Sequence, residues 1–328
     1  MNELYPLRLQ PILRQYLWGG RRFATILGRT LGPGDDYAES WEICDHGADQ
    51  TRVLVGPLAG TTLQDLVRER GAELLGCQQG LGCFPLLLKL LDANRRLSVQ
   101  VHPNDALAAQ ANPPDQGKTE AWVVLAAQPG ATIYAGLKSG VDRAALDEAV
   151  RAGRCEECLH QFQPRVGDCV FIPAGTVHAL GEGLLIYEIQ QASDLTYRLF
   201  DWNRVGPDGR PRALHVAEAL AATDFSCGPV APQVPVAHSP EGHWRLVDCD
   251  KFVLDRWELR SAAQLGGGSI CHLLTVVEGE LRLPNDPAGP VQIGETVLVP
   301  ASCGPVVVEP APTAVVLDAC VRGLGIRD

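Results

Sequence analysis

Glycine and proline break this chain into short segments, and this punctuation is the strongest constraint on its fold. The 328 residues include 34 glycines and 24 prolines, so few stretches are long enough for extended helices. Between the breaks lie apolar runs of strand length, the clearest at residues 84–91, 97–102, 121–126, 169–173 and 184–189. Short apolar runs bounded by turn residues are typical of β-sheets. The punctuation therefore predicts a mainly β fold.

Helical periodicity is limited to three segments. Residues 61–75 begin with a threonine cap and then repeat apolar residues on one helical face. Residues 141–160 and 213–221 predict two further short helices. We therefore expect short helices to decorate a β fold.

A proline-rich stretch at residues 228–241 shows little periodic pattern and predicts a linker. Beyond it, short strands are predicted at residues 251–260, 271–277, 280–283, 295–300 and 314–321. The predicted layout is a larger β domain with small helical segments at residues 1–235, followed by a smaller all-β domain at residues 236–328.

The chain is acidic, with a formal net charge of −11 and a pI of about 5.2. An acidic surface repels phosphate backbones, so we expect no nucleic-acid partner. We also expect no membrane association and a cytoplasmic protein, because no apolar run could span a bilayer and the first residues lack a signal-peptide core. The 11 cysteines show no framework spacing, and Cys155 and Cys158 are interpreted as two thiols on a short helix. The sequence leaves the oligomeric state open.

Two side chains of the segment LSVQVHP, Gln100 and His102, are two residues apart and therefore share one face of a strand. Glu120 begins the next apolar run, with Lys118 two residues before it. His178 follows a Pro-x-Gly turn that ends another strand, which places its imidazole at the mouth of a barrel. Two imidazoles, a carboxylate and an amide oxygen form a ligand set that suits zinc and, less selectively, other divalent transition metals.

Residues 294–305 repeat the glycine and proline spacing of residues 167–178, which end in His178. Ser302 and Pro305 stand where the second glycine and the histidine would be. We therefore expect a second barrel of the same kind that lacks metal ligands. His272 lies in that part of the chain without companions, and the remaining histidines have no partner pattern.

Several segments together resemble type I phosphomannose isomerases of the short bacterial kind, which belong to the cupin superfamily. These segments lie at residues 18–20 (WGG), 38–43 (AESWEI), 84–93 (FPLLLKLLDA), 97–105 (LSVQVHPND), 117–122 (GKTEAW), 173–180 (PAGTVHAL) and 187–204 (YEIQQASDLTYRLFDWNR). The resemblance implies a cupin (jelly-roll) catalytic barrel at residues 1–235 and a degenerate cupin-like domain after it. It also implies one Zn²⁺ per chain, with Gln100, His102, Glu120 and His178 as the ligands.

The resemblance implies interconversion of mannose 6-phosphate and fructose 6-phosphate through an enediolate. The catalytic arginine of the family falls on Arg198, and we assign it stabilisation of the enediolate charge because a guanidinium stays protonated. The proton carrier stays open between Glu188, Lys118 and a water on the metal. The large helical insertion of longer family members is absent.

The substrate phosphate needs a positive end of the cleft, and Ser98, Lys89 and Arg204 are the predicted ligands, with Lys118 as a possible addition. Longer family members tend to have lysine in place of Arg204. Lys89 interrupts an apolar run, and an unpaired buried lysine would be costly, which favours a functional role.

Three other functions compete with this interpretation. An iron dioxygenase could use His102, Glu120 and His178 as its triad, although Gln100 fills a fourth position. A non-catalytic sugar-binding cupin predicts substitutions among the ligands or at Arg198, and none is present. An isomerase of a different sugar phosphate stays open.

Overall fold

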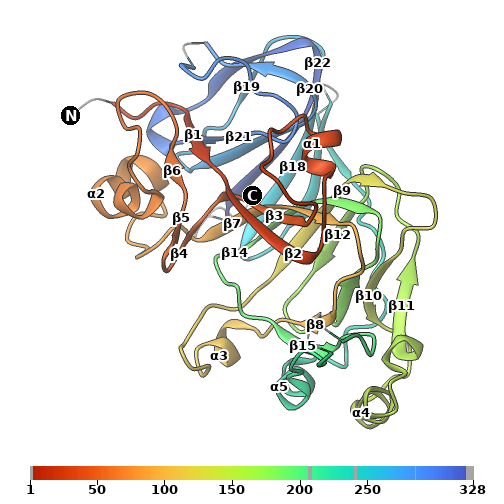
Figure 1. The fold of residues 1–328 in the computed structure, drawn as a ribbon. Coiled ribbons are helices and arrows are strands. Elements are labelled where there is room, and N and C mark those ends of the chain that lie inside the picture. Colours follow the sequence, from red (N-terminus) through yellow and green to blue (C-terminus); the bar gives the residue numbers. More distant parts are fainter. Residues whose placement is uncertain (1–2, 206–208, 240–241, 285, 323–328) are drawn as a thin grey trace.

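The computed structural model describes residues 3–205, 209–239, 242–284 and 286–322, and strands dominate it (Figure 1). The predicted mainly β fold is confirmed. Three large sheets, of nine, six and five strands, account for nearly all described strands, and a hairpin of β4 (Asp45–His46) and β5 (Asp49–Gln50) completes them.

The two smaller sheets form a sandwich of the cupin type. The six-stranded sheet has the order β12 (Cys169–Ile172), β9 (Glu120–Ala127), β14 (Leu184–Gln191), β7 (Leu86–Ala93), β3 (Tyr37–Ile43) and β2 (Ile12–Gly20). The five-stranded sheet has the order β11 (Leu159–Phe162), β10 (Ile133–Leu137), β13 (His178–Leu180), β8 (Val99–Val101) and β15 (Tyr197–Phe200). Trp122 and Ile186 of the first sheet share one buried cluster with Ile133 and Leu180 of the second.

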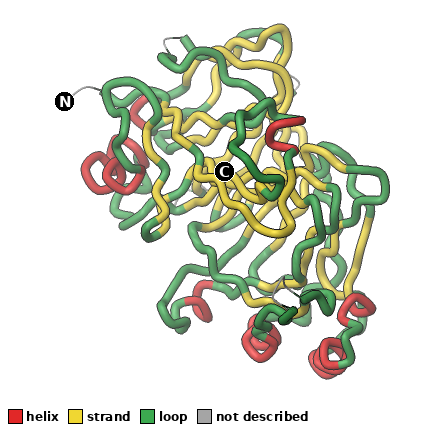
Figure 2. Tube along the Cα trace, viewed as in Figure 1, coloured by secondary structure: helices red, strands yellow, loops and turns green. Residues whose placement is uncertain are grey.

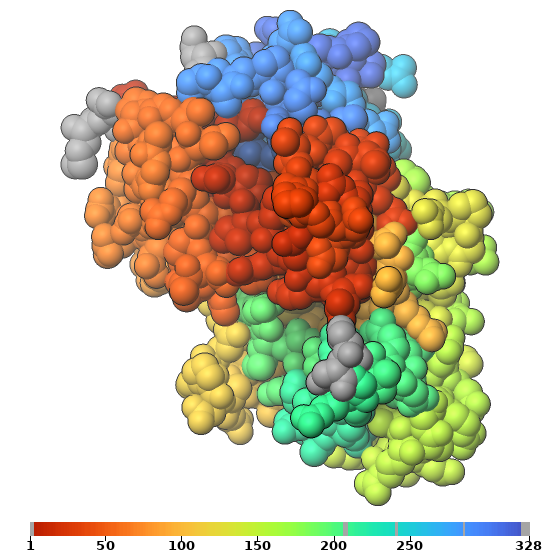
Figure 3. All heavy atoms as spheres, viewed as in Figure 1, coloured from red at the N-terminus to blue at the C-terminus, as the bar shows by residue number. Residues whose placement is uncertain are grey.

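The nine-stranded sheet joins the two ends of the chain. Its order is β16 (Val236–Ser239), β17 (His243–Asp248), β18 (Phe252–Leu259), β22 (Val306–Val321), β20 (His272–Arg282), β21 (Thr296–Val299), β1 (Leu7–Gln10) and β6 (Arg52–Val53), with β19 (Ala263–Leu265) beside β22. Leu7 of β1 is paired with Leu298 of β21. In Figure 3 the red N-terminal segment accordingly packs against the blue C-terminal part. The division at residue 235 stays a prediction.

The six-stranded sheet is covered on both faces, which explains its continuous apolar runs. On β7, Leu88 and Leu90 pack in the same cluster as Phe252 of the nine-stranded sheet. Leu91 packs on the opposite face, toward the five-stranded sheet. Every residue of β7 is consequently buried. Because side chains alternate along a strand, Lys89 points toward the five-stranded sheet, as Leu91 does.

The helices lie at the periphery of the sheets (Figure 2). They are α1 (Arg22–Thr25), α2 (Leu63–Leu75), α3 (Asp105–Ala108), α4 (Arg143–Arg151) and α5 (Val216–Ala222), with 3₁₀ turns at Cys155–Cys158 and Ala301–Cys303. The predicted cap of α2 is confirmed, since the Thr62 hydroxyl accepts a hydrogen bond from the backbone of Asp65. Within the described ranges, no helix is both long and apolar enough to cross a membrane.

Several predicted boundaries were wrong, including the start of β22, which begins at Val306 and not at residue 314. The helix expected at 141–160 ends at Arg151, because Gly153 adopts a positive φ that helix interiors do not allow. The expected linker contains β16. Residues 271–277 and 280–283 form one strand, β20, whose register shifts on both sides of Gly279. This irregularity produced the apparent break in the sequence pattern.

His272 is not without companions, as the sequence had suggested. Its Nδ1 lies 2.8 Å from Asp318 Oδ1, and its Nε2 lies 3.1 Å from the carbonyl oxygen of Gly267. Burial lowers the pKa of His272, but the charge and hydrogen bond of Asp318 outweigh burial and raise it above the ordinary value. The degenerate barrel therefore holds a buried ion pair at this position.

We expect this ion pair to make stability depend on pH. Because folding raises the pKa of His272, its stabilising contribution is fully present below the unfolded pKa of about 6.5 and disappears as pH rises through the folded pKa. The difference in free energy of unfolding between the wild type and His272→Gln should be larger at about pH 6 than at about pH 9. Urea unfolding at both pH values checks this, and a pH-independent difference would contradict it.

Candidate active site

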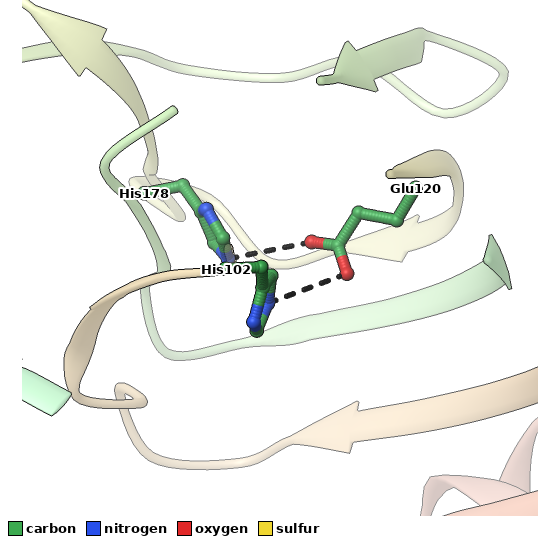
Figure 4. Close-up of side chains that lie close together, drawn as sticks. All are labelled: His102, Glu120 and His178. Carbon is green, nitrogen blue, oxygen red and sulfur yellow. Dashed lines mark ion pairs between the residues drawn. The ribbon is translucent and has the colours of Figure 1, made fainter. Parts of the chain in front are cut away.

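The two sheets of the sandwich bring His102, Glu120 and His178 together. Glu120 is the first residue of β9 in the six-stranded sheet. His178 begins β13 in the five-stranded sheet, and His102 follows β8, the neighbouring strand. Figure 4 shows both imidazoles directed toward the carboxylate of Glu120. All three side chains are buried, so His178 lies inside the sandwich and not at its mouth.

The ligand atoms of these residues converge. His178 Nε2 lies 3.3 Å from Glu120 Oε1, and His102 Nε2 lies 3.5 Å from Glu120 Oε2. Zinc bonds of about 2.0–2.2 Å in a tetrahedral site would place neighbouring ligand atoms about 3.3–3.6 Å apart. These two separations fall in that range, and one ligand atom from each of the three residues lies within 4.8 Å of the others, close enough for all three to share a metal ion.

Backbone carbonyls hold both imidazoles in the tautomer with Nδ1 protonated, which leaves Nε2 free to bind a metal. Nδ1 of His102 donates to the carbonyl oxygen of Leu195 at 3.0 Å, and Nδ1 of His178 donates to that of Thr176 at 2.9 Å. Each Nε2 therefore directs a lone pair toward Glu120. Burial lowers the pKa of His178 to about 4, and burial together with Lys118 lowers the pKa of His102, so both rings are neutral near neutral pH.

Two of the converging atoms have no hydrogen-bond partner. Glu120 Oε1 and His178 Nε2 are buried and unsatisfied, although they face each other. Two lone pairs in a buried site repel each other unless a cation lies between them. The donor set thus fits a divalent metal, and within the described part of the chain it is the one His/Cys/Asp/Glu cluster with metal-binding geometry.

Gln100, the predicted fourth ligand, lies between two other site residues in the five-stranded sheet. Its Cα partners across the strands are His178 and Arg198. Val99 and Val101 are fully buried on the opposite face, as the alternation predicts. The assignment of Gln100 as a ligand stays a prediction.

A glycine turn carries the chain from β12 across to His178. Gly175 adopts a φ of +90°, which side-chain-bearing residues rarely adopt. Its backbone N–H donates to the carbonyl oxygen of His102 at 2.8 Å. The Pro-x-Gly-x-x-His motif therefore forms a turn that is hydrogen-bonded to the segment that carries His102.

Lys118 and Glu188 extend the site beyond the predicted ligands. The ammonium of Lys118 lies 2.6 Å from Glu120 Oε2, 3.1 Å from His102 Nε2 and 3.8 Å from Glu188 Oε1. Glu188 is buried on β14 and accepts a hydrogen bond from the indole of Trp122 at 2.9 Å. Burial raises the pKa of Glu188, while Lys118 opposes this shift.

A cleft of about 350 Å³ adjoins this cluster. Six of the predicted site residues line it, namely Lys89, Ser98, Gln100, Lys118, Glu188 and Arg198. Arg204 does not line it and lies instead in an adjoining cleft of about 450 Å³. The structure therefore separates Arg204 from the other predicted phosphate ligands.

Lys89 is buried but not unpaired, which corrects the premise of its sequence-based interpretation. Its ammonium lies 3.3 Å from Asp194 Oδ1 and 3.6 Å from Glu39 Oε2, and 4.6 Å from the ring centre of Trp41. Burial opposes its charge, yet Glu39 and Asp194 raise the pKa of Lys89. The carboxylates of Glu39 and Asp194 therefore offset the electrostatic cost of burying the Lys89 ammonium.

Sequence reasoning missed Arg212, which lines both clefts. Its guanidinium donates a hydrogen bond to the carboxylate of Asp201, and no pattern in the sequence links these two residues. The sequence carries no signal for this contact, since Arg212 lies in a loop without periodic pattern.

Comparisons with known proteins agree with this geometry. Residues 6–127 match the model of the phosphomannose isomerase type I catalytic domain. The chain is 33% identical over 307 residues to a mannose-6-phosphate isomerase of Bacillus subtilis, covering 91% of this chain and 94% of the relative. It is 34% identical to a mannose-6-phosphate isomerase of Streptococcus mutans, covering 85% of this chain and 86% of the relative.

A solved structure extends the match to the whole fold. The crystal structure of a mannose 6-phosphate isomerase from Bacillus subtilis superposes with a TM-score of 0.87 at 29% identity, covering 96% of this chain and 99% of that one. Fold and site together define a cupin-type metal enzyme. The chain belongs to the type I phosphomannose isomerase family.

Proposed function

We propose that this protein is a metal-dependent mannose-6-phosphate isomerase that interconverts mannose 6-phosphate and fructose 6-phosphate. The observation that carries the proposal is the buried trio of His102, Glu120 and His178 beside a cleft that also contains Lys118 and Arg198. The names of the curated relatives support the same reaction. A cytoplasmic location is part of the proposal, and the oligomeric state stays open.

We propose one Zn²⁺ per chain, held by Gln100, His102, Glu120 and His178. Nitrogen and oxygen ligands with neutral imidazoles support this choice of metal. A bound zinc ion would supply Lewis-acid polarisation of an oxygen of the substrate.

Arg198 is proposed to stabilise the negative charge of the enediolate. Its guanidinium donates to the carbonyl oxygen of Ala213 at 3.0 Å, and its Nε is buried without a partner. Arg198 lines the cleft and makes no ion pair with a carboxylate of the described residues, although the charge of Asp201 acts on it from a distance, so its guanidinium can face a substrate anion. Proton abstraction is not assigned to Arg198, because a guanidinium stays protonated.

Glu188 and Lys118 are the proposed carriers of the proton between neighbouring carbons of the substrate. Both line the cleft, and the two groups lie 3.8 Å apart. A carboxylate whose pKa is raised by burial is a better base and acid near neutral pH than an exposed one. Ser98 and Lys89 line the same cleft and are proposed to contact the substrate.

The test is an assay of the purified protein with mannose 6-phosphate, in which fructose 6-phosphate is detected and oxygen consumption is recorded. We expect isomerisation without oxygen uptake. Oxygen uptake without isomerisation would instead support a cupin dioxygenase, the competing use of the same three ligands.

A further inference from the structure

Trp122 lies between His178 and Glu188, buried in the sandwich beside the cleft. Its ring meets the His178 imidazole edge-on, with ring centres 5.3 Å apart and ring planes at 75°. Its indole N–H donates a hydrogen bond to Glu188 Oε2 at 2.9 Å. The Trp122 side chain is 1% exposed and does not line the cleft. Trp122 can therefore act on a substrate only through the groups that it contacts.

Strand pairing places Trp122 directly opposite Glu188. Trp122 is two residues after Glu120 on β9, so the two side chains share one face of the strand. On β14, Glu188 is the Cα partner of Trp122, and Gln190 is that of Glu120. Side chains directly opposite each other on neighbouring strands have Cβ atoms about 4.5–5.5 Å apart. The register of β9 and β14 therefore brings the indole N–H to the Glu188 carboxylate.

The two carboxylate oxygens of Glu188 have different surroundings. Among the described residues, Trp122 is the one group that donates a hydrogen bond to this carboxylate, and it does so at Oε2. Oε1 lies 3.8 Å from the ammonium of Lys118, and Glu188 lines the cleft. Lys89 flanks Glu188 on the other side but forms its ion pairs with other carboxylates. Since a carboxylate has about four acceptor sites, Oε1 keeps lone pairs for a substrate.

The direction of Oε1 matters for a proton carrier. Isomerisation removes a proton from one carbon and returns it to the neighbouring carbon, so the base must stay aimed at both. A displacement of about 1 Å can cost about 100-fold in rate. A glutamate side chain has several rotatable bonds and samples different orientations unless a contact restrains it. A hydrogen bond to one oxygen restrains the other, and an ionised acceptor makes this bond stronger than one between neutral groups.

We propose that Trp122 is a positioning residue of the isomerisation, whose indole N–H holds Oε2 of Glu188 and so directs Oε1 toward the reacting carbons. This inference rests on the proposed function and deepens the role that Glu188 has in it. Trp122 itself transfers no proton, because its indole nitrogen serves only as a donor. The N–H acts on the proton carrier, while the edge of the ring packs against His178.

Trp122→Phe separates these two contacts, since phenylalanine keeps an aromatic ring beside His178 but removes the N–H. We expect kcat with mannose 6-phosphate to fall about 10–100-fold, with KM changed less than about threefold. Metal content should equal that of the wild type. Benzothienylalanine at position 122 replaces only the N–H by sulfur and should lower kcat to the same extent. It also decides the question if Trp122→Phe does not fold.

A double-mutant cycle with Glu188→Gln tests whether Trp122 acts through Glu188. A glutamine cannot carry the proton, so adding Trp122→Phe to Glu188→Gln should lower kcat little further. Losses that multiply in the double variant would overturn the inference, as would an unchanged kcat in the benzothienylalanine protein. Loss of metal from Trp122→Phe would assign its effect to His178 and would also overturn the inference.

Trp257→Phe is the matched control. Trp257 lies on β18 of the nine-stranded sheet, and its indole nitrogen is buried without a hydrogen-bond partner among the described residues. Its replacement should leave kcat and KM unchanged. Wild-type protein without isomerase activity would contradict the proposed function and this inference with it, whereas an active wild type with multiplying losses would contradict this inference alone.

Discussion

Replacing Glu120 by glutamine is expected to remove both metal and activity. The amide keeps the shape of the side chain but loses the charge that faces His102 and His178 at 3.5 and 3.3 Å. Loss of an outer-shell partner alone costs about 10–100-fold in metal affinity, so loss of a charged ligand should cost more than about 100-fold. Metal content and isomerase rate of the same purified sample measure the two effects.

Two variants control for damage to the fold. Glu182→Gln makes the same change at an exposed glutamate and should keep metal and rate. Glu120→Gln also removes the nearer of the two carboxylates that pair with Lys118, so thermal unfolding must be measured. Glu120→Asp keeps the charge and should recover part of the metal binding. A folded Glu120→Gln protein with full metal and full rate would contradict the site.

Arg198→Gln is expected to lower kcat by about 10²–10³-fold, the usual effect of removing a group that stabilises charge in a transition state. KM should change much less, because the charge that Arg198 stabilises develops only during the reaction. Metal content should equal that of the wild type, since Arg198 is not a ligand. Steady-state kinetics together with metal analysis check all three expectations.

Arg143→Gln is the matched control for Arg198→Gln. Arg143 also donates to a backbone carbonyl, that of Leu220 at 3.2 Å, but it lies on α4 and lines neither cleft. It should leave kcat unchanged. If Arg198→Gln raised KM with kcat intact, Arg198 would bind the ground state of the substrate and would not stabilise the enediolate.

Local periodicity predicted those parts of the site that depend on one strand. The side chain of Gln100 lies at the cleft, and those of its neighbours Val99 and Val101 are buried on the opposite face of the strand, as the alternation indicates. A strand fixes side-chain direction from residue to residue. The side chains of Lys118 and Glu120 likewise lie on the same side of the chain, and the Lys118 ammonium is 2.6 Å from Oε2 of Glu120. Such information is contained within a few residues of sequence.

Contacts between distant segments could not be predicted in this way. Lys89 looked unpaired because Glu39 and Asp194 lie far from it along the chain. His272 looked isolated for the same reason, since Asp318 reaches it only when β20 and β22 pair. A single sequence records which groups are charged but not which of them meet after folding.

The position of the N-terminal strands also depends on pairing between segments that lie far apart in the sequence. β1 pairs with β21, near the other end of the chain, and apolar periodicity cannot specify such a partner. The extent of the helix at Arg143–Arg151 was overestimated because capping by Gly153 was not taken into account. Element type was thus predictable, while boundaries and partners were not.

Removing metal from the wild-type protein and then titrating it with zinc tests directly whether isomerisation depends on a bound metal. We expect chelation to abolish conversion of mannose 6-phosphate, and activity to return in proportion to zinc until one ion per chain is bound. His178→Ala should neither bind zinc at this site nor recover activity. Full activity in protein that metal analysis shows to be free of metal would contradict a metal-dependent isomerase.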